Sequence, residues 1–218
     1  MISLNKCIIY ITYGILLQLL IEVKSQAIFN PDMREAHTAT FINDKLYILG
    51  GVISLDTNMV PPKENLYLDF SAPFNTTELK WHDLSIDNIV PPHYFAAAVK
   101  GGLNNSTLFL YGGENITIET KALVYTFDTQ VNKWSIPEMT GKLPTGKLGI
   151  TPIIDHYGLI YFFGGLTTYL GGVYVNDMFI LDSINLSWKR VSSINAPSPR
   201  SQLGAVLLPN NNILYMGM

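Results

Sequence analysis

Histidine, cysteine and carboxylate side chains are where catalysis or metal binding would show first, and this chain offers them in no useful pattern. The sequence holds four histidines and one cysteine. His37, His82, His93 and His156 are scattered, and no two stand at the spacing of a metal-binding pair. Cys7 lies in an apolar N-terminal run, so neither an intrachain disulfide nor a cysteine metal site is expected. We therefore predict no metal and no cofactor.

Motifs for nucleophilic catalysis and phosphate binding are also absent from the sequence. It contains no Gly-x-Ser-x-Gly, no His-Glu-x-x-His and no Walker sequence. The glycine pairs at 101–102 and 171–172 lack the strand-to-helix context that phosphate binding requires. These observations predict a protein that is not an enzyme and has no catalytic residues within this chain.

Basic residues recur in one local setting. Arg34, His93, Lys147 and Arg200 each stand just before a short apolar run. If these runs are equivalent strands of a repeat, the four side chains share one face and form a rim that attracts an acidic peptide or sugar. The alternative is that they neutralise nearby carboxylates or are solvated turn residues, which is the commoner fate of surface charges.

The segments that follow these basic residues form an internal repeat. Four of them align, at 34–51, 93–113, 147–165 and 200–217. Each has a short apolar run, a polar turn and a second apolar run that contains Tyr or Phe. The first three end on glycine doublets: Gly50-Gly51, Gly112-Gly113 and Gly164-Gly165. A doublet at this point predicts a turn where a side chain would clash, or a positive φ.

Tryptophan recurs with nearly the same period as the repeat. Trp81, Trp134 and Trp188 are separated by 53 and 54 residues. In the first unit the loop before Trp81 is longer, which we interpret as an insertion around 72–77. A tryptophan on the outer strand of each unit is expected to supply a large apolar plate between adjacent sheets.

Each complete unit therefore predicts four short strands that are rich in aromatic and β-branched residues. The first strands are 38–42, 96–99, 150–154 and 204–208, and the second strands are 45–49, 107–111, 159–163 and 212–216. The third strands are 65–69, 123–127 and 177–181, and the fourth begins at the tryptophan. Pro152 falls inside one first strand, where it is acceptable only at an edge or bulge. Four-stranded sheets that recur radially form a β-propeller.

The pattern resembles the Kelch-repeat family, whose units carry an apolar strand ending in Gly-Gly and then Tyr and Trp at characteristic distances. A period of about 50 residues is the Kelch spacing. The resemblance covers residues 34 to 218 and implies an all-β, Kelch-type β-propeller with about three and a half four-stranded blades visible. The units are about 34–90, 91–143, 144–196 and a partial 197–218. Kelch proteins bind other proteins through loops on one face, some at the cell surface, and the central domain of galactose oxidase shares the repeat.

The N-terminus has the pattern of a signal peptide. The run from Cys7 to Ile21 is uncharged, and polar residues follow it, so we predict a signal peptide at 1–25 and a mature domain at 26–218. The run is shorter than the ~20 residues that span a bilayer, and an uncleaved signal anchor is the alternative. Five glycosylation sequons fit a secreted or cell-surface location: Asn75, Asn104, Asn105, Asn115 and Asn185.

Charge and the unfinished fourth unit bear on the partners. The net charge is −3 and no basic run occurs, so no nucleic-acid partner is expected. No second apolar stretch of membrane-spanning length follows the N-terminal run. A half-built fourth blade exposes a strand edge and an apolar face. We expect this chain to be a fragment of a longer protein; self-association through the open edge is the alternative.

The function expected from these patterns is a binding scaffold for a protein or carbohydrate ligand in the secretory pathway or at the cell surface. One alternative is a fragment of a galactose-oxidase-like sugar-acting enzyme whose catalytic residues lie outside this chain. The copper chemistry of that enzyme needs a tyrosine cross-linked to a cysteine, and no cysteine follows Cys7. A non-functional gene remnant is a third possibility.

Overall fold

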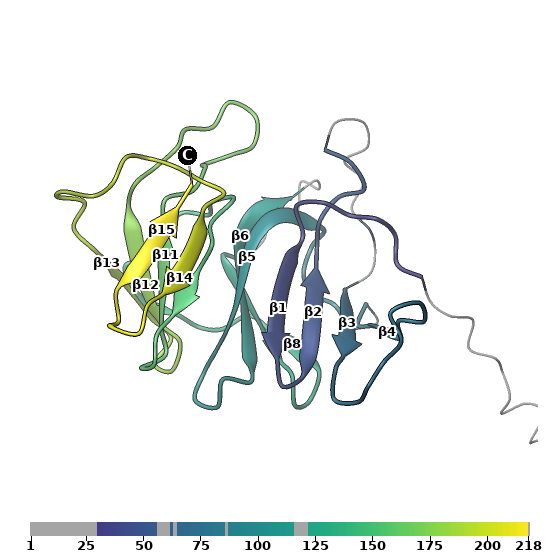
Figure 1. The fold of residues 1–218 in the computed structure, drawn as a ribbon. Coiled ribbons are helices and arrows are strands. Elements are labelled where there is room, and N and C mark those ends of the chain that lie inside the picture. The colour runs from purple at the N-terminus through teal and green to yellow at the C-terminus, as the bar shows by residue number, and fades with distance from the viewer. Residues whose placement is uncertain (1–29, 56–61, 63–64, 86, 116–121, 218) are drawn as a thin grey trace, which may run out of the picture. The chain divides into compact units, whose positions relative to one another are not determined.

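The domain consists of four sheets that follow one another along the chain, and all their strand pairs but one are antiparallel (Figure 1). The computed structural model describes residues 30–55, 62, 65–85, 87–115 and 122–217, and the predicted signal peptide at 1–25 lies outside them. Residues from Pro31 onward form one compact unit. In the described ranges all regular secondary structure is β-strand, and no helix is long and apolar enough to cross a bilayer. The all-β prediction is therefore confirmed.

Each of the first three sheets is built around a run of four strands in chain order, in which each strand pairs with the next. The first sheet contains β1 (Thr38–Ile42), β2 (Lys45–Leu49), β3 (Leu66–Asp69) and β4 (Trp81–Asp83). The second contains β5 (His93–Gly101), β6 (Thr107–Asn115), β7 (Val124–Asp128) and β8 (Lys133–Ser135). The third contains β10 (Ile153–Ile154), β11 (Leu159–Phe163), β12 (Met178–Asp182) and β13 (Ser187–Arg190). The fourth has only β14 (Gly204–Leu207) and β15 (Ile213–Met216), so the prediction of three and a half blades is confirmed.

The third sheet differs from the expected plan at both edges. A two-residue strand, β9 (Thr140–Gly141), pairs in parallel with β13, although it lies in the segment expected to belong to the second unit. The inner strand β10 is shorter than the predicted strand at 150–154 and begins after Pro152. Because proline has no backbone N–H to give to a ladder, pairing starts only at Ile153.

The hydrophobic core lies between consecutive sheets. Side chains alternate between the two faces of a strand, so each sheet has a forward face, toward the sheet that follows it in the chain, and a backward face. Tyr47 and Leu49 on the forward face of the first sheet share a buried cluster with Leu108 and Leu110 on the backward face of the second. A second cluster joins the forward face of the second sheet to the backward face of the third. The second strands of the second and third sheets are apolar on both faces because each packs on both sides.

Tryptophan seals these interfaces as expected, most clearly at Trp188. Its ring lies 5.8 Å from that of Tyr111 in the second sheet and 5.2 Å from that of Phe162 in its own sheet. Trp134 is also buried, in the cluster between the first and second sheets. Trp81 in the first sheet is only partly buried, and no sheet covers its side among the described residues.

The glycine doublets occupy equivalent, crowded positions: Gly112 and Gly113 lie within β6, and the other two doublets directly follow β2 and β11. All six of their residues have positive φ. A Cβ on Gly112 would stand 2.3 Å from the carbonyl oxygen of Lys147, and one on Gly164 would stand 2.4 Å from that of Arg200. The second glycine of each doublet donates its N–H to the carbonyl of the next basic residue: Gly51 to His93 (2.8 Å), Gly113 to Lys147 (2.9 Å) and Gly165 to Arg200 (2.8 Å). The doublets are therefore needed both for φ and for the close approach of the next sheet.

Candidate functional site

A chain of backbone hydrogen bonds connects the starts of the four units. Its members, which we call the ladder, stand two residues after each predicted basic residue: Ala36, Phe95, Gly149 and Gln202. Phe95 N–H donates to the Ala36 carbonyl at 2.8 Å, Gly149 N–H to the Phe95 carbonyl at 3.0 Å, and Gln202 N–H to the Gly149 carbonyl at 2.6 Å. All four residues are left-handed, with φ of 57°, 52°, 61° and 54°.

This conformation is unusual for Phe95, because a bulky side chain disfavours positive φ. Such strain persists only where the surrounding structure imposes it, and it concentrates at functional sites. Here the hydrogen bonds on both sides of Phe95 hold its backbone, and the ring is only partly buried. The ladder thus presents an aromatic side chain at the end of the domain where the first strands begin.

A cavity of about 380 Å³ opens beside the ladder, where the second, third and fourth units meet. Its lining residues come from the starts of those units and from the loop at 166–174, which follows the third glycine doublet. They are Phe95, Leu148, Gly149, Leu166, Tyr169, Leu170, Tyr174, Ser201 and Gln202. We call this space the ladder cavity.

Aromatic stacking and one carboxylate hold the 166–174 loop over the cavity. The ring of Tyr169 stacks on Phe95 with a centroid separation of 5.6 Å and an interplanar angle of 26°. Tyr94 meets the same Tyr169 ring edge-on at 5.9 Å. Glu114, at the end of β6, accepts hydrogen bonds from the Tyr169 N–H at 2.9 Å and from the Thr168 hydroxyl at 3.2 Å. A residue of the second unit therefore positions the 166–174 loop of the third.

The cavity is suited to binding without covalent chemistry. None of its lining residues is a histidine, cysteine, carboxylate, lysine or arginine. Across the described part of the chain, no three His, Cys, Asp or Glu side chains come together in a metal-binding cluster. Burial, together with Glu114 and Tyr169, raises the pKa of the Tyr94 hydroxyl, so this tyrosine is neutral at physiological pH. The site offers apolar and aromatic surface edged by the side chains of Ser201 and Gln202.

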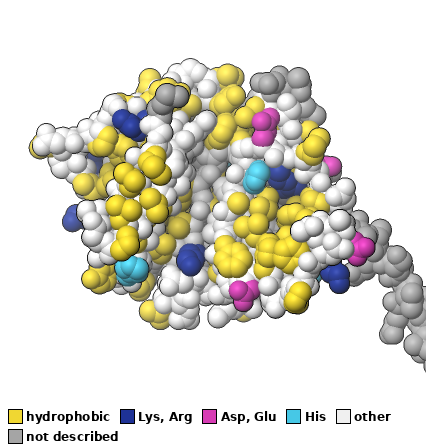
Figure 2. All heavy atoms as spheres, in the orientation of Figure 1, with side chains coloured by type: hydrophobic (Ala, Val, Ile, Leu, Met, Phe, Trp, Pro, Cys, Tyr) yellow, Lys and Arg dark blue, Asp and Glu magenta, His cyan; other side chains and the backbone are white. Residues whose placement is uncertain are grey.

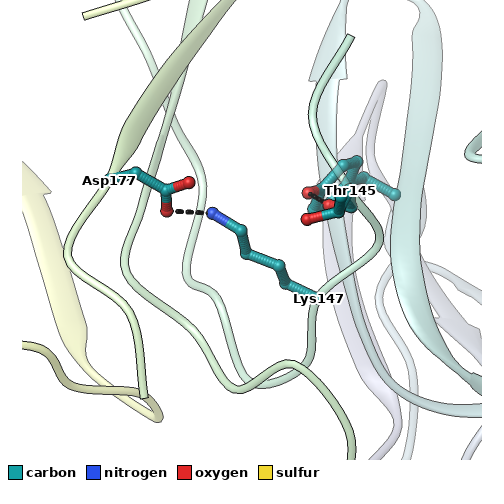
Figure 3. Close-up of polar contacts among 4 residues, drawn as sticks. Thr145, Lys147 and Asp177 are labelled. Carbon is teal, nitrogen blue, oxygen red and sulfur yellow. Dashed lines mark hydrogen bonds and ion pairs between the residues drawn. The ribbon is translucent and has the colours of Figure 1, made fainter. Parts of the chain in front are cut away.

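The four basic residues occupy equivalent positions, as predicted, but two of their side chains are buried. His93 is 5% exposed, and its Nδ1 donates to the Pro91 carbonyl at 2.9 Å. Lys147 is 3% exposed and forms an ion pair with Asp177 (Figure 3). The expectation that all four side chains ring a surface rim is wrong for these two, because the neighbouring sheets enclose them.

Burial sets the electrostatics of Lys147. Removal from water lowers the pKa of its ammonium group, and the hydrogen bond to Asp177 opposes that shift. The ammonium also lies 5.2 Å from the centre of the Phe179 ring, a favourable cation–π position. Lys147 therefore has the alternative role considered from the sequence, neutralisation of a carboxylate.

Arg34 and Arg200 are more accessible, and a ligand role for them stays a prediction. Arg200 borders a second space of about 410 Å³ that shares Tyr174, Ser201 and Gln202 with the ladder cavity. Its guanidinium donates to the Ser198 carbonyl at 3.1 Å and to the Gly217 carbonyl at 3.2 Å. These bonds fix a positive charge at the edge of the candidate site.

Most of the predicted glycosylation sequons lie away from this site. Asn104 and Asn105 are exposed in the β5–β6 turn, and Asn185 is exposed in the β12–β13 turn. Both turns are at the opposite ends of the strands from the ladder. Asn75 is exposed in the β3–β4 loop, and Asn115 ends β6 with the rest of its sequon outside the described residues. Glycosylation of these residues stays a prediction.

Sequence reasoning missed the aromatic residues of the ladder cavity. Phe95 and Tyr169 come from different units, and their stacking depends on how the second and third sheets pack. A usable signal existed for Phe95, because it stands at the same place in its repeat as Gly149. For Tyr169 and Tyr174 only their position after a glycine doublet pointed to a surface loop.

Comparison with known proteins agrees with the repeated sheets and the glycine turns. Residues 36–218 match the model of the KLHDC2/KLHL20/DRC7 Kelch-repeats domain. The chain belongs to the Kelch-repeat family. The more specific likeness to the galactose oxidase propeller stays a prediction.

Individual relatives of this Kelch chain are distant. Kelch domain-containing protein 3 of Rattus norvegicus is 26% identical over 193 residues, which cover 84% of this chain and 48% of the relative. The Homo sapiens protein of that name is 24% identical over 179 residues, or 76% of this chain and 43% of the relative. Host cell factor 1 of Homo sapiens is 33% identical over 116 residues, 51% of this chain and 6% of the relative. The chain thus spans about half the length of Kelch domain-containing protein 3.

Proposed function

We propose that this Kelch chain is a non-enzymatic scaffold that binds a peptide segment of a partner protein in the ladder cavity. The observation that carries the proposal is the cavity itself: about 380 Å³, lined by three aromatic rings and three leucines together with Gly149, Ser201 and Gln202. Binding sites for small ligands and peptides have this composition, apolar walls with a few positioned polar groups. A Kelch fold supplies the rigid support that keeps such loops in place.

A peptide fits this lining better than a carbohydrate does. The lining combines leucine and aromatic side chains with the polar groups of Ser201, Gln202 and two tyrosines, and a peptide offers both apolar side chains and backbone donors and acceptors to match them. A sugar presents a hydroxyl on most of its carbons and needs a partner for each one it buries. The exposed Leu170 and Tyr174, at 81% and 59% exposure, are the kind of side chains that pack against an incoming apolar residue. Arg200 at the edge adds attraction for an acidic side chain.

The test is selection of binders from a displayed random peptide library, followed by affinity measurement on variants of the full chain. Leu170→Asp and Tyr174→Ala should each weaken the selected peptides about 10-fold or more, because both remove exposed contact surface without disturbing the core. Tyr157→Ala is the matched control, since Tyr157 is 75% exposed at the opposite ends of the strands. An equal loss of peptide affinity in Tyr157→Ala would contradict the proposal. So would a chain that selects no peptide and binds only sugars on a glycan array.

We further propose that this binding takes place in the secretory pathway or outside the cell. The support is the apolar run from Cys7 to Ile21 and the exposure of Asn75, Asn104 and Asn185. The chain should shift to lower apparent mass on endoglycosidase treatment after expression in a glycosylating cell. A combined Asn→Gln substitution of the sequons is the control. An unshifted protein that remains inside the cell would exclude this location.

A further inference from the structure

A cavity of about 340 Å³ opens at the end of the strands opposite the ladder, and we call it the turn cavity. One wall is the β5–β6 turn of the second unit and another is the β10–β11 turn of the third, with Ile184 of the β12–β13 turn beside them. Figure 2 shows histidine and Lys or Arg side chains beside hydrophobic ones at this end of the domain, the lower one in that view. The ladder cavity lies at the other end.

A buried serine fixes the two walls of the turn cavity relative to each other. Ser183, which directly follows β12 and is 2% exposed, accepts the Gly102 N–H of the second unit at 3.0 Å. Its hydroxyl donates to the Gly158 carbonyl of the third unit at 2.7 Å. The Asp155 carboxylate accepts the Tyr157 N–H at 2.9 Å and so holds the β10–β11 turn itself. The cavity is therefore a preorganised cleft between turns of two units.

Exposed side chains of mixed character surround the turn cavity. Leu103, Tyr157 and Ile184 are 79%, 75% and 45% exposed. A group of large apolar side chains on one surface marks a place that another molecule or group covers. Lys100 and His156, also exposed in this lining, add an ammonium group and an imidazole, which the lining of the ladder cavity lacks. The expected occupant therefore has both apolar faces and many hydrogen-bonding groups, as a saccharide does.

An asparagine in this lining is itself a predicted glycosylation site. Asn105 is exposed in the β5–β6 turn and begins the sequon Asn-Ser-Thr at 105–107. A sugar attached to Asn105 starts at the cavity wall, so it packs there without the entropy cost that a free ligand has on association. The neighbouring Asn104 does not line the cavity. The Nδ2 atom of Asn185, the nitrogen that would carry its sugar, donates to the Asp182 carboxylate at 2.8 Å.

We propose that Asn105 carries an N-linked glycan whose first sugars lie in the turn cavity and cover Leu103, Tyr157 and Ile184. The proposal rests on the secretory location proposed above, because N-glycosylation takes place in that pathway. The apolar faces of the sugar rings pack on the Tyr157 ring, and their hydroxyl and N-acetyl groups form hydrogen bonds with the lining. The glycan shields the apolar tips of the turns from water and from other proteins.

The covalent step uses the lipid-pyrophosphate-linked oligosaccharide that the secretory pathway supplies. A bond forms between Asn105 Nδ2 and the anomeric carbon of the first sugar, and the bond from that carbon to the pyrophosphate oxygen breaks. The lipid pyrophosphate leaves, and the amide nitrogen gives up one proton. No atom is oxidised or reduced.

The first test is the glycan occupancy of the full chain after expression in a glycosylating cell, measured by peptide mapping with mass spectrometry. Asn105 should carry a glycan. Thr107→Val should abolish it and Ser106→Ala should not, because the first removes only the Asn105 sequon and the second only the Asn104 sequon. Asn105→Asp, which also leaves the Asn104 sequon intact, is the second variant if Thr107→Val melts earlier than the natural chain.

The occupancy of the other sequons separates this proposal from the proposed location. A chain that carries a glycan at another sequon and none at Asn105 would overturn the turn-cavity proposal and leave the secretory location standing. A chain without any glycan would overturn both.

The second test asks whether the glycan lies on the cavity, through the rate at which tetranitromethane nitrates Tyr157 in the folded chain. The glycosylated chain should react about 5-fold or more slowly than the Thr107→Val chain, because the ring is open only while the glycan is away from it. Tyr174, 59% exposed at the ladder end, is the internal control and should react equally in both chains. Equal rates at Tyr157 with and without the glycan would overturn the proposal, since the glycan would then extend into solvent.

Discussion

The interface between the second and third sheets and the interface between the third and fourth are built on one plan but differ in completeness. In the former, Phe162 lies 4.8 Å from Tyr111 and 5.2 Å from Trp188, within a cluster of eleven buried residues. In the latter, the equivalent residue Tyr215 has one aromatic contact, Phe163, and belongs to a sheet of two strands. Among the described residues, the fourth sheet consists of β14 and β15 alone.

The basic residues show the same contrast. Lys147, at the start of the third unit, is enclosed and paired with Asp177. Arg200, at the start of the fourth, is partly exposed and donates to backbone carbonyls. The same repeat position is therefore a buried structural cation when a complete sheet covers it and a surface group when only half a sheet does. What a repeat residue does depends on its neighbour as much as on its own unit.

The largest expected effect is on the complete interface. Phe162→Ala should lower the free energy of unfolding by about 3–5 kcal/mol, because it removes a buried ring and leaves a cavity. Leu214→Ala in β15 of the fourth sheet, where the side chain is 44% exposed, should cost less than about 1 kcal/mol. Chemical denaturation of both variants makes the measurement. Similar losses would mean that Leu214 contributes as much to stability as the enclosed Phe162 ring.

The second-largest effect is expected when Lys147 loses its anionic partner Asp177 in the complete interface. Asp177→Asn leaves the Lys147 ammonium buried without its anionic partner and should cost about 3 kcal/mol in unfolding free energy. The double substitution Lys147→Met with Asp177→Asn should recover most of that loss, since it removes the unpaired charge. Arg200→Met at the open interface is the comparison, with an expected cost below about 1 kcal/mol. A small effect of Asp177→Asn would show that water reaches Lys147.

A smaller difference, between two glycine variants, is expected at the crowded Gly112 of the complete interface. Gly112 has φ of +68° and its Cβ would meet the Lys147 carbonyl at 2.3 Å, whereas Gly171 has φ of +72° with nothing within 4 Å. Both Ala variants incur the left-handed backbone cost of roughly 1–2 kcal/mol. Gly112→Ala should lose about 2 kcal/mol more, through the steric clash. Equal melting temperatures for the two variants would show that the neighbouring sheet moves to accommodate the added methyl group.

The smallest effect at neutral pH is expected for Tyr215→Phe at the open interface. Burial raises the pKa of the Tyr215 hydroxyl to about 12, and in the described structure this buried hydroxyl has no hydrogen-bond partner. The substitution should therefore change stability by less than about 0.5 kcal/mol at pH 7. A raised folded pKa means that the unfolded chain loses its proton first, so this stability is complete below pH about 10 and is lost as pH rises toward 12.

The pH dependence gives the measurement. Melting temperatures of the natural chain should fall between about pH 10 and 12, and those of Tyr215→Phe should fall less. Tyr111→Phe is the contrasting variant, because the Tyr111 hydroxyl donates to the Thr145 carbonyl at 2.6 Å and its loss should be felt already at pH 7. If the melting temperatures of the natural chain and of Tyr215→Phe fell equally with rising pH, the raised pKa of Tyr215 would be contradicted.

The positions of many strands could be predicted because they depend on short segments of sequence. The strands 38–42, 45–49 and 159–163 were predicted with the bounds that the structure shows. Strands of this kind are read from short aromatic and β-branched runs between turn residues. The prediction was less accurate at β10, which starts after Pro152, and at β9, whose parallel pairing joins a segment to a sheet that begins only after it.

The candidate site was less predictable than the fold. The ladder cavity depends on Phe95, Tyr169 and Gln202, which are separated by long stretches of sequence and meet only through sheet packing. The predicted rim instead relied on the type of residue at an equivalent position. The four basic residues do occupy equivalent positions in the repeat. Their side chains are not all exposed, because the adjoining sheet buries His93 and Lys147.

The sequence by itself determined the family, the order of the strands and the places where glycine is required. These depend on periodic side-chain type and on φ, both of which are properties of short segments. The tertiary structure alone decided which basic side chains are enclosed, which aromatic rings meet at the ladder cavity and which faces remain uncovered. The reason is physical: burial and contact arise between sheets, and the same residue is core or surface according to whether the next sheet covers it.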